Sequence, residues 1–376
     1  MSVLWPKISL LLNRVIKLRS TELDVLIVGG GTAGLLTALH IRNRAVTILE
    51  QRRAIGASTH CSGIVSIATA ERLDIPEEII EGVYSRLVLH VDNQRRLVFE
   101  APKSVAVKIA RDEHVKLLKQ LVEDRGHEVV LGARALHIDP MHGSTVVHSR
   151  DGVKTLKAKT MVIAEGALMK LSREVGLRCV SLKLGGIQAY FEVSQRIDGE
   201  SIHVYTHNFL GKGFGWVVPT RRGVLVGVLS ERMTFHRFKV FIAMLKKQGI
   251  ISRRTSPFFG GTVLRGYPLS VTKSSVAGIG DAVAMVKSLS SGGLYAISLA
   301  SRVLAKSVDS NNLKDYGKWV SKKLSPQLAL QYGCAKLAFL NNAVLLRTLS
   351  GIVKRKIHLH PRDFDDHTKL IIRALI

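Results

Sequence analysis

Cysteine is scarce in this chain of 376 residues. The three cysteines, Cys61, Cys179 and Cys334, have no paired spacing, which excludes a disulfide framework, indicates no metal site and favours a reducing cytoplasm. Beyond the N-terminus, no run of residues is long and apolar enough to span a bilayer. Phe, Trp and Tyr make up only 6% of the chain, so a local cluster of these aromatic residues is informative.

Acidic residues are also few, at 29 against 55 Lys and Arg, which gives a formal net charge of +26. This positive field attracts nucleic acid, an anionic membrane surface or a phosphorylated substrate. No RNA-recognition motif accompanies it, so specific nucleic-acid binding is not expected; a solvated basic surface is the alternative. The length allows two or three subdomains, and the hydrophobic content of 46% indicates a globular protein.

The first twenty residues contain four basic residues, no acid and apolar side chains at roughly helical spacing. This pattern favours an amphipathic helix after Pro6 that lies in a membrane interface, because it is too short to span a bilayer and lacks a signal-peptide cleavage site. An extension caused by a mis-chosen start codon is the alternative. We therefore expect a cytoplasmic protein, peripheral on the inner face of the membrane, with no transmembrane span.

A glycine-rich turn follows a buried strand near the N-terminus. The strand Val25–Val28 leads into the turn, a helix is expected from about Ala33 to Asn43, and a second strand, residues 45–49, ends in Glu50. Strand, turn, helix and acid in this order are typical of a dinucleotide-binding βαβ unit.

Each glycine of this turn has a physical use. Gly29 makes the tight turn, Gly31 lets a pyrophosphate approach the backbone, and Gly34 lets the helix pack on the strand. The amides of the helix N-terminus then face the phosphates, and Glu50 is placed to accept hydrogen bonds from the adenosine ribose. Gln51 and Arg52 directly follow this acid and are further candidates for cofactor contact.

A second glycine-rich segment lies near residue 280. A strand ends in Gly280-Asp281, and Gly292-Gly293 opens a helix about ten residues later. Asp281 is placed to bind the ribityl chain of a flavin, and amides around Gly292 to face the flavin N1 and O2 edge. Together with the N-terminal turn, this segment predicts FAD as the dinucleotide.

Three stretches between these segments add candidate residues. Cys61, Ser62 and Gly63 form a small-residue run where the chain is expected to return towards the flavin, although Cys61 alone would be read as an ordinary half-buried thiol. Arg111 stands just before an amphipathic helix that we expect Asp112 to cap, so it is placed to reach a cofactor or to be solvated.

An aromatic cluster lies in the second half of the chain, at Phe214-Gly215-Trp216-Val217-Val218-Pro219. Phe214 and Trp216, two residues apart, can line one side of a pocket. His203, Tyr205 and His207 share a strand face, but no carboxylate or cysteine completes a metal site there.

The order of these motifs resembles the p-hydroxybenzoate hydroxylase-type FAD superfamily, and within it the archaeal geranylgeranyl reductase family. His60-Cys61-Ser62-Gly63 is similar to that family's cysteine motif, and residues 214–219 to its aromatic substrate motif, with Val218 in place of Phe. Val286-Lys287 followed by Gly292-Gly293-Leu294-Tyr295 is similar to its glycine-rich stretch, with Ser288 and Ser291 as departures. The resemblance covers about residues 23–302.

The resemblance implies a Rossmann-like FAD-binding domain interleaved with an antiparallel β-sheet substrate domain, followed by a C-terminal helical segment. We expect an N-terminal extension (1–20), three FAD-binding segments (21–83, 104–180 and 271–305), an inserted hairpin (84–103) and main part (181–270) of the substrate domain, and a basic helical tail (306–376).

The family's activity is FAD-dependent saturation of isolated double bonds in geranylgeranyl diphosphate or archaeal ether-lipid precursors. The resemblance implies that Phe214, Trp216, Pro219 and Tyr295 bind the isoprenoid and that Cys61 lies near the reaction centre. NAD(P)H or a ferredoxin is the expected electron donor, since no second dinucleotide fingerprint is visible. A monooxygenase or halogenase on the same fold, and a basic flavoprotein that binds RNA, are the alternatives.

Overall fold

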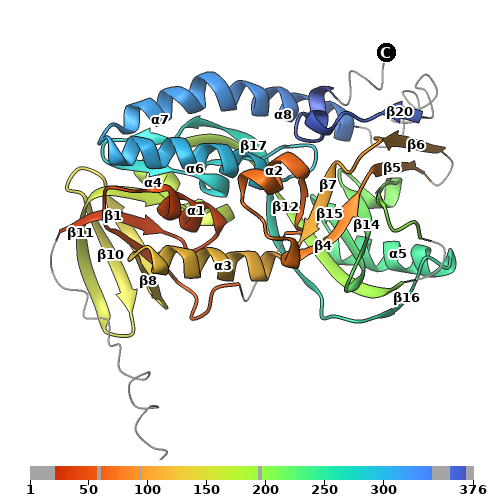
Figure 1. Ribbon diagram of the computed structural model, residues 1–376, viewed down its shortest axis with the longest axis horizontal. Helices are drawn as coiled ribbons and strands as arrows, with labels where there is room; N and C mark the ends of the chain where they lie inside the picture. The colour runs from red at the N-terminus through yellow and green to blue at the C-terminus, as the bar shows by residue number, and fades with distance from the viewer. Residues whose placement is uncertain (1–21, 57–60, 93–94, 194–196, 341–355, 370–376) are drawn as a thin grey trace, which may run out of the picture.

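The computed structural model describes residues 22–56, 61–92, 95–193, 197–340 and 356–369. Its first layer is a sheet whose central strands run in the order β19-β11-β1-β2-β8, all parallel (Figure 1). Val25, Leu26 and Ile27 in β1 are fully buried, as expected for a parallel strand covered on both faces. This sheet and its flanking helices form the Rossmann-like part of the fold.

The strands of this first sheet include an antiparallel extension, β9 and β10, at its edge. The strand bounds are β1 Leu23–Val28, β2 Val46–Glu50, β8 Glu128–Leu131, β9 Arg134–Asp139, β10 Ser144–Ser149, β11 Gly152–Ile163, β18 Thr272–Lys273 and β19 Val276–Gly278.

The second layer is a larger sheet, seen at the right of Figure 1 with α5 packed on it. Its path is β16-β12-β15-β14-β13-β5-β6-β20, with β17 paired to β12. The bounds are β5 Arg86–Val91, β6 Arg95–Glu100, β12 Arg178–Val193, β13 Ser201–Thr206, β14 Phe214–Thr220, β15 Gly223–Ser230, β16 Ile251–Arg254, β17 Phe259–Ser270 and β20 Lys356–His358. The sheet is mainly antiparallel, but β13 pairs with β5, and β20 with β6, in parallel.

A small three-stranded sheet connects the two layers: β3 Ile64–Ser66, β4 Ile80–Tyr84 and β7 Ala106–Ile109. The helices are α1 Thr32–His40, α2 Ile67–Arg72, α3 Arg111–Asp124, α4 Lys170–Val175, α5 Thr234–Lys247, α6 Leu294–Asp309, α7 Leu313–Trp319 and α8 Ser325–Leu340. In Figure 1, α6, α7 and α8 lie together along the upper side of the molecule, and α1 packs against α6 and α3.

Two expected helix ends need correction. The first helix ends at His40, not near Asn43, because Asp309 at the end of α6 accepts hydrogen bonds from the backbone amides of Arg42 and Asn43. Asp112 does not cap α3: the helix already begins at Arg111, and Asp112 lies in its first turn.

The C-terminal segment is helical through α8, but it is not helical throughout. The chain returns at residue 356 as strand β20, paired with β6 through Lys356↔Val98, Ile357↔Phe99 and His358↔Glu100. The helix expected within residues 1–20 lies outside the described residues, as does the stretch 341–355. Among the described residues, no helix is both long enough and apolar enough to cross a bilayer.

Candidate cofactor and substrate site

The glycine turn lies between β1 and α1 and is held tightly on one side. A Cβ added to Gly29, which has φ +115°, would lie 2.2 Å from the carbonyl oxygen of Ala164, and one added to Gly34 would lie 2.0 Å from that of Gly29. A Cβ on Gly31 would meet no protein atom within 4 Å. The turn is therefore closed where helix and strand pack and open at Gly31, as a pyrophosphate requires.

Glu50 ends β2 beside this turn. Its Oε2 accepts a hydrogen bond from the Gly30 amide at 2.9 Å, and its Oε1 accepts one from the Arg52 amide at 2.9 Å. The carboxylate thus braces the glycine turn while it remains on the wall of the adjoining chamber. Each oxygen has lone pairs left for ribose hydroxyls.

The Arg111 guanidinium is held in the site by two side-chain partners. Its Nη2 donates to Thr32 Oγ1 at 2.6 Å, its Nη1 lies 2.8 Å from His114 Nδ1, and its buried Nε has no partner among the described residues. Burial lowers the pKa of the Arg111 guanidinium, while Cys61 and Asp281 act in the opposite direction. Arg111 therefore joins the cysteine run to the second glycine-rich segment.

Asp281 lies in the short helical turn Gly280–Val283 after β19. Burial raises the pKa of its carboxyl to about 6, with Arg111 opposing the shift. A Cβ on Gly293 would lie 3.2 Å from Asp281 Oδ1, so the turn and the start of α6 are in contact. The Gly-Asp segment and the Gly-Gly helix start thus meet as predicted.

The second sheet supplies an apolar wall to the same chamber. Alternate residues of β5 and β13 point into it, and Phe214 and Trp216 of β14 lie beside them with ring centroids 5.9 Å apart. The chamber volume is about 1000 Å³. Its apolar wall is formed by Leu87, Leu89, Ile202, Val204, Phe214, Trp216 and Val263, among others.

Most predicted site residues line this one chamber. They are Gly29, Gly31, Glu50, Gln51, Arg52, Cys61, Ser62, Arg111, Phe214, Trp216, Asp281, Gly292 and Gly293. Cys61 is exposed, and its Sγ accepts a hydrogen bond from the Gly63 amide at 3.4 Å.

Five predicted residues do not line the chamber. Gly34, Gly63 and Gly280 pack against neighbouring chain atoms, Gly63 because a Cβ there would lie 2.4 Å from the Ile109 carbonyl oxygen. Pro219 continues β14 away from the chamber, and its carbonyl accepts a hydrogen bond from the buried Tyr84 hydroxyl. Tyr295 instead contacts Gln327 through its hydroxyl, at 3.3 Å, and Arg72 through its ring. Pro219 and Tyr295 are thus not among the residues that line the chamber, and their contact with a substrate stays a prediction.

Glu165-Gly166, at the end of a predicted strand, is a further candidate for backbone approach to the cofactor. Both residues line the chamber, and the Glu165 carboxylate accepts hydrogen bonds from the first amides of α4. Other chamber residues were not predicted as site residues. The C-terminal segment contributes Leu359, Phe364 and His367, and α8 contributes Phe339. No local sequence signal marks these residues, because their position depends on chain segments that return from far along the sequence.

His203 and Tyr205 make no metal site. His203 Nδ1 lies 3.1 Å from His90 Nε2, and Tyr205 stacks on His90 with centroids 4.1 Å apart. Among the described residues, no group of three His, Cys, Asp or Glu side chains is arranged to hold a metal ion.

The residues present fit a flavin dinucleotide. An open pyrophosphate turn, an acid beside it, a buried cation and a helix N-terminus line one chamber. Arg111 Nε and Ser291 Oγ are buried on its wall without hydrogen-bond partners in the described part of the chain. Buried polar atoms normally have hydrogen-bond partners, so the missing partners of these two atoms indicate a polar ligand.

Comparison with known proteins agrees with this geometry. Residues 24–115 match the family described as FAD dependent oxidoreductase. This match covers the glycine turn, Glu50 and Arg111, and together with the fold and the site it supports the activity of an FAD-dependent oxidoreductase.

Among its relatives, the chain is similar to digeranylgeranylglycerophospholipid reductase 2 of Methanopyrus kandleri, with 27% identity over 75% of this chain and 76% of the relative. It also shares the fold of a geranylgeranyl bacteriochlorophyll reductase-like protein from Thermoplasma acidophilum, with a TM-score of 0.79, 20% identity and coverage of 88% and 90% of the two chains. A p-nitrophenol 4-monooxygenase from Pseudomonas putida matches with a TM-score of 0.69 and 13% identity over 95% and 99%.

Proposed function

We propose that this oxidoreductase saturates isolated C=C bonds of geranylgeranyl chains, carried by geranylgeranyl diphosphate or by archaeal ether-lipid precursors. The observation that carries the proposal is the continuity of the dinucleotide site with an apolar wall built from the second sheet. An isoprenoid chain has only apolar surface to offer, so an extended dry wall is the recognition it needs. Relatives named as geranylgeranyl reductases support the same substrate class.

The cofactor site would be divided among the described residues as follows. Gly31 and the first amides of α1 face the pyrophosphate, Glu50 the ribose, and Asp281 with the α6 N-terminus the flavin end. When bound and reduced, FAD would supply the hydride for one alkene carbon. The chain itself orients the alkene with Phe214 and Trp216 and excludes water from the apolar wall.

Cys61 is our candidate for the proton donor to the other alkene carbon. It lines the chamber beside Arg111, and a thiol is able to donate a proton. The electron donor, NAD(P)H or ferredoxin, stays a proposal drawn from the sequence.

A monooxygenase is the second candidate, because the p-nitrophenol 4-monooxygenase fold matches over nearly the whole chain. Oxygen dependence separates the two. The flavin is reduced anaerobically and a geranylgeranyl lipid is added; a reductase reoxidises its flavin without oxygen, whereas a monooxygenase does so only after oxygen is admitted. Trp216→Ala should slow reoxidation about tenfold or more through loss of apolar contact, while flavin content stays near that of the unmodified chain.

We further propose that the protein binds anionic membrane surfaces, and that α5 provides the contact. Residues 232–254 contain seven Lys and Arg and no acid. Phe235 and Phe258 are 45% and 41% exposed, with Lys239 Nζ 4.6 Å from the Phe235 ring centroid and Arg254 Cζ 4.1 Å from that of Phe258. Exposed aromatic side chains among cations are typical of an interfacial surface.

Vesicle flotation tests this contact. The protein should float with phosphatidylglycerol vesicles and not with phosphatidylcholine vesicles, and salt should weaken the binding. Lys246→Ala/Lys247→Ala should weaken vesicle binding about tenfold or more, because each basic side chain near the surface contributes about 1 kcal/mol. The control Lys154→Ala/Lys157→Ala removes the same charge from the exposed β10–β11 hairpin. Equal losses in both variants would contradict a role for α5.

A further inference from the structure

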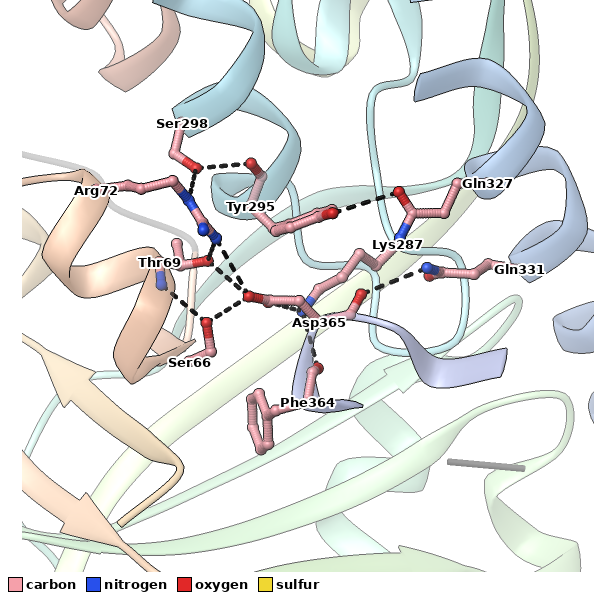
Figure 2. Close-up of polar contacts among 10 residues, drawn as sticks. All are labelled: Ser66, Thr69, Arg72, Lys287, Tyr295, Ser298, Gln327, Gln331, Phe364 and Asp365. Atoms are coloured by element: carbon pink, nitrogen blue, oxygen red, sulfur yellow. Dashed lines mark hydrogen bonds and ion pairs between the residues drawn. The ribbon is translucent and has the colours of Figure 1, made fainter. Parts of the chain in front are cut away.

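The C-terminal segment reaches back across the molecule to a buried cluster at the chamber wall. After β20, the helical turn Pro361–Phe364 places Asp365 between α2 and the loop that precedes α6 (Figure 2). Asp365 is 7% exposed. A carboxylate this deeply buried is stable only when it is paired and hydrogen-bonded.

The Asp365 carboxylate has four donors. Its Oδ2 accepts hydrogen bonds from Ser66 Oγ and from Thr69 Oγ1, the latter at 2.9 Å, and Arg72 Nη2 lies 3.4 Å away. Its Oδ1 lies 2.9 Å from Lys287 Nζ. Burial alone would raise the pKa of Asp365, but Lys287 and the hydroxyl donors outweigh it, so the pKa lies below its ordinary value and the group is a carboxylate.

Lys287 is the partner that belongs to the chamber. Its side chain is 7% exposed and lines the chamber, and its Nζ lies 5.7 Å from the Tyr295 ring centroid and 5.6 Å from that of Phe364. Among the described residues, Asp365 is its one carboxylate partner. Without Asp365 this ammonium would be buried beside aromatic rings with no countercharge.

The backbone of Lys287 closes the loop that forms the flavin end of the site. Its amide donates to the Gly292 carbonyl at 3.0 Å, and its carbonyl accepts from the Ser291 amide at 2.7 Å. Ser291 has φ +57°, a conformation that a residue other than glycine adopts at a cost. The loop ends at Gly293, the N-cap residue of α6. The strained backbone at Ser291 persists only where surrounding contacts hold the loop in place.

We propose that Asp365 is a positioning residue of the cofactor site: it fixes Lys287, and through Lys287 the 287–293 loop that faces the flavin. The C-terminal segment is then part of the FAD site, although it lies far from the dinucleotide motifs in sequence. The inference rests on flavin binding alone and not on the identity of the substrate. It would stand if the geranylgeranyl activity proved wrong.

The matched variants Asp365→Asn and Asp366→Asn test it. Asp366 is the neighbouring acid, and its carboxylate pairs with the exposed Lys369 at 3.6 Å, outside the chamber wall. Each purified apoprotein is titrated with FAD, and the dissociation constant, the visible spectrum of the bound flavin and the Tm are recorded. Asp365→Asn should weaken FAD binding by about tenfold or more and alter the spectrum, because a buried Lys287 left unpaired displaces the loop. Asp366→Asn should match the unmodified chain.

A lower Tm with an unchanged dissociation constant and spectrum in Asp365→Asn would overturn the proposal, since it would show a purely structural ion pair. A double-mutant cycle adds a second criterion. Lys287→Met/Asp365→Asn should bind FAD no worse than Asp365→Asn alone, whereas additive losses would contradict action through Lys287. If Asp365→Asn does not fold, Thr69→Val removes a single donor to Asp365 and should give a smaller shift of the same FAD dissociation constant; no shift would overturn the proposal.

Discussion

At the scale of single residues, two glycines of the same turn, three positions apart, have different roles. Gly34 is in contact with backbone, whereas Gly31 faces open space on the chamber side. The motif predicts this division, with Gly31 for the pyrophosphate and Gly34 for packing of the helix on the strand. The space around each glycine in the structure agrees with it.

Alanine substitutions distinguish these duties. Gly34→Ala should lower the Tm of the apoprotein, because its Cβ would overlap the Gly29 carbonyl oxygen, and the cost of such overpacking is about 1–3 kcal/mol. Gly31→Ala should leave the apoprotein Tm near its original value and weaken FAD binding by about tenfold or more, because the methyl group occupies pyrophosphate space. The checks are thermal denaturation of both apoproteins and FAD titration of Gly31→Ala. Normal FAD affinity in Gly31→Ala would contradict this placement of the phosphates.

The residue scale also marks the limit of sequence reasoning about the site. Glu50, Arg111 and Asp281 each follow a strand at a recognisable spacing, so their convergence could be predicted. Asp365 and His367 could not, because they belong to no motif and their positions depend on a segment that returns after α8. The motif that contains Tyr295 fixes the helix start but not where its side chain points, so its position off the chamber lining could not be predicted.

At the scale of elements, strands with a hydrophobic pattern in their own sequence could be predicted. Strands that form only because a distant strand edge is free to pair could not. The buried run of β1 and the alternation in β5 and β13 are local signals. β20 has only three residues and forms because the edge of β6 is available to it. Likewise, α1 ends early because α6, distant in sequence, supplies Asp309 to its last amides.

The pairing of β5 with β13 brings two histidines together and makes the second sheet sensitive to acid. Burial lowers the pKa of His90 to about 3 and that of His203 to about 4, with Arg96 acting in the same direction on both and Asp198 opposing the shift at His203. Both are therefore neutral in the folded protein at neutral pH. Their contribution to stability is present above about pH 6.5 and is lost as the pH falls below that value towards 4.

We expect the Tm of the apoprotein to fall steeply between pH 6.5 and 4. His203→Gln should make that fall shallower, since one depressed pKa is removed. His148→Gln, at an exposed histidine on β10, is the control and should leave the slope unchanged. The measurement is Tm against pH for the three proteins. Identical slopes in all three would show that this pair does not govern the acid response.

At the scale of the whole molecule, one chamber joins a dinucleotide site to an apolar sheet face, with the C-terminal segment as part of its wall. The chain carries a net charge of +26, so the head group of an anionic isoprenoid lipid would be attracted to its basic surface, while the isoprenoid chain would meet the apolar wall. Monooxygenases share the fold, so the fold alone does not choose between hydrogenation and oxygenation.

The mass of the lipid product chooses between them most directly. The protein is loaded with FAD, reduced under strict exclusion of oxygen and incubated with a geranylgeranyl lipid, which is then extracted for mass spectrometry. Our account predicts a gain of two hydrogen atoms for each bond saturated, with no oxygen incorporated. An unchanged lipid under these conditions, together with a gain of one oxygen atom once air is admitted, would contradict it.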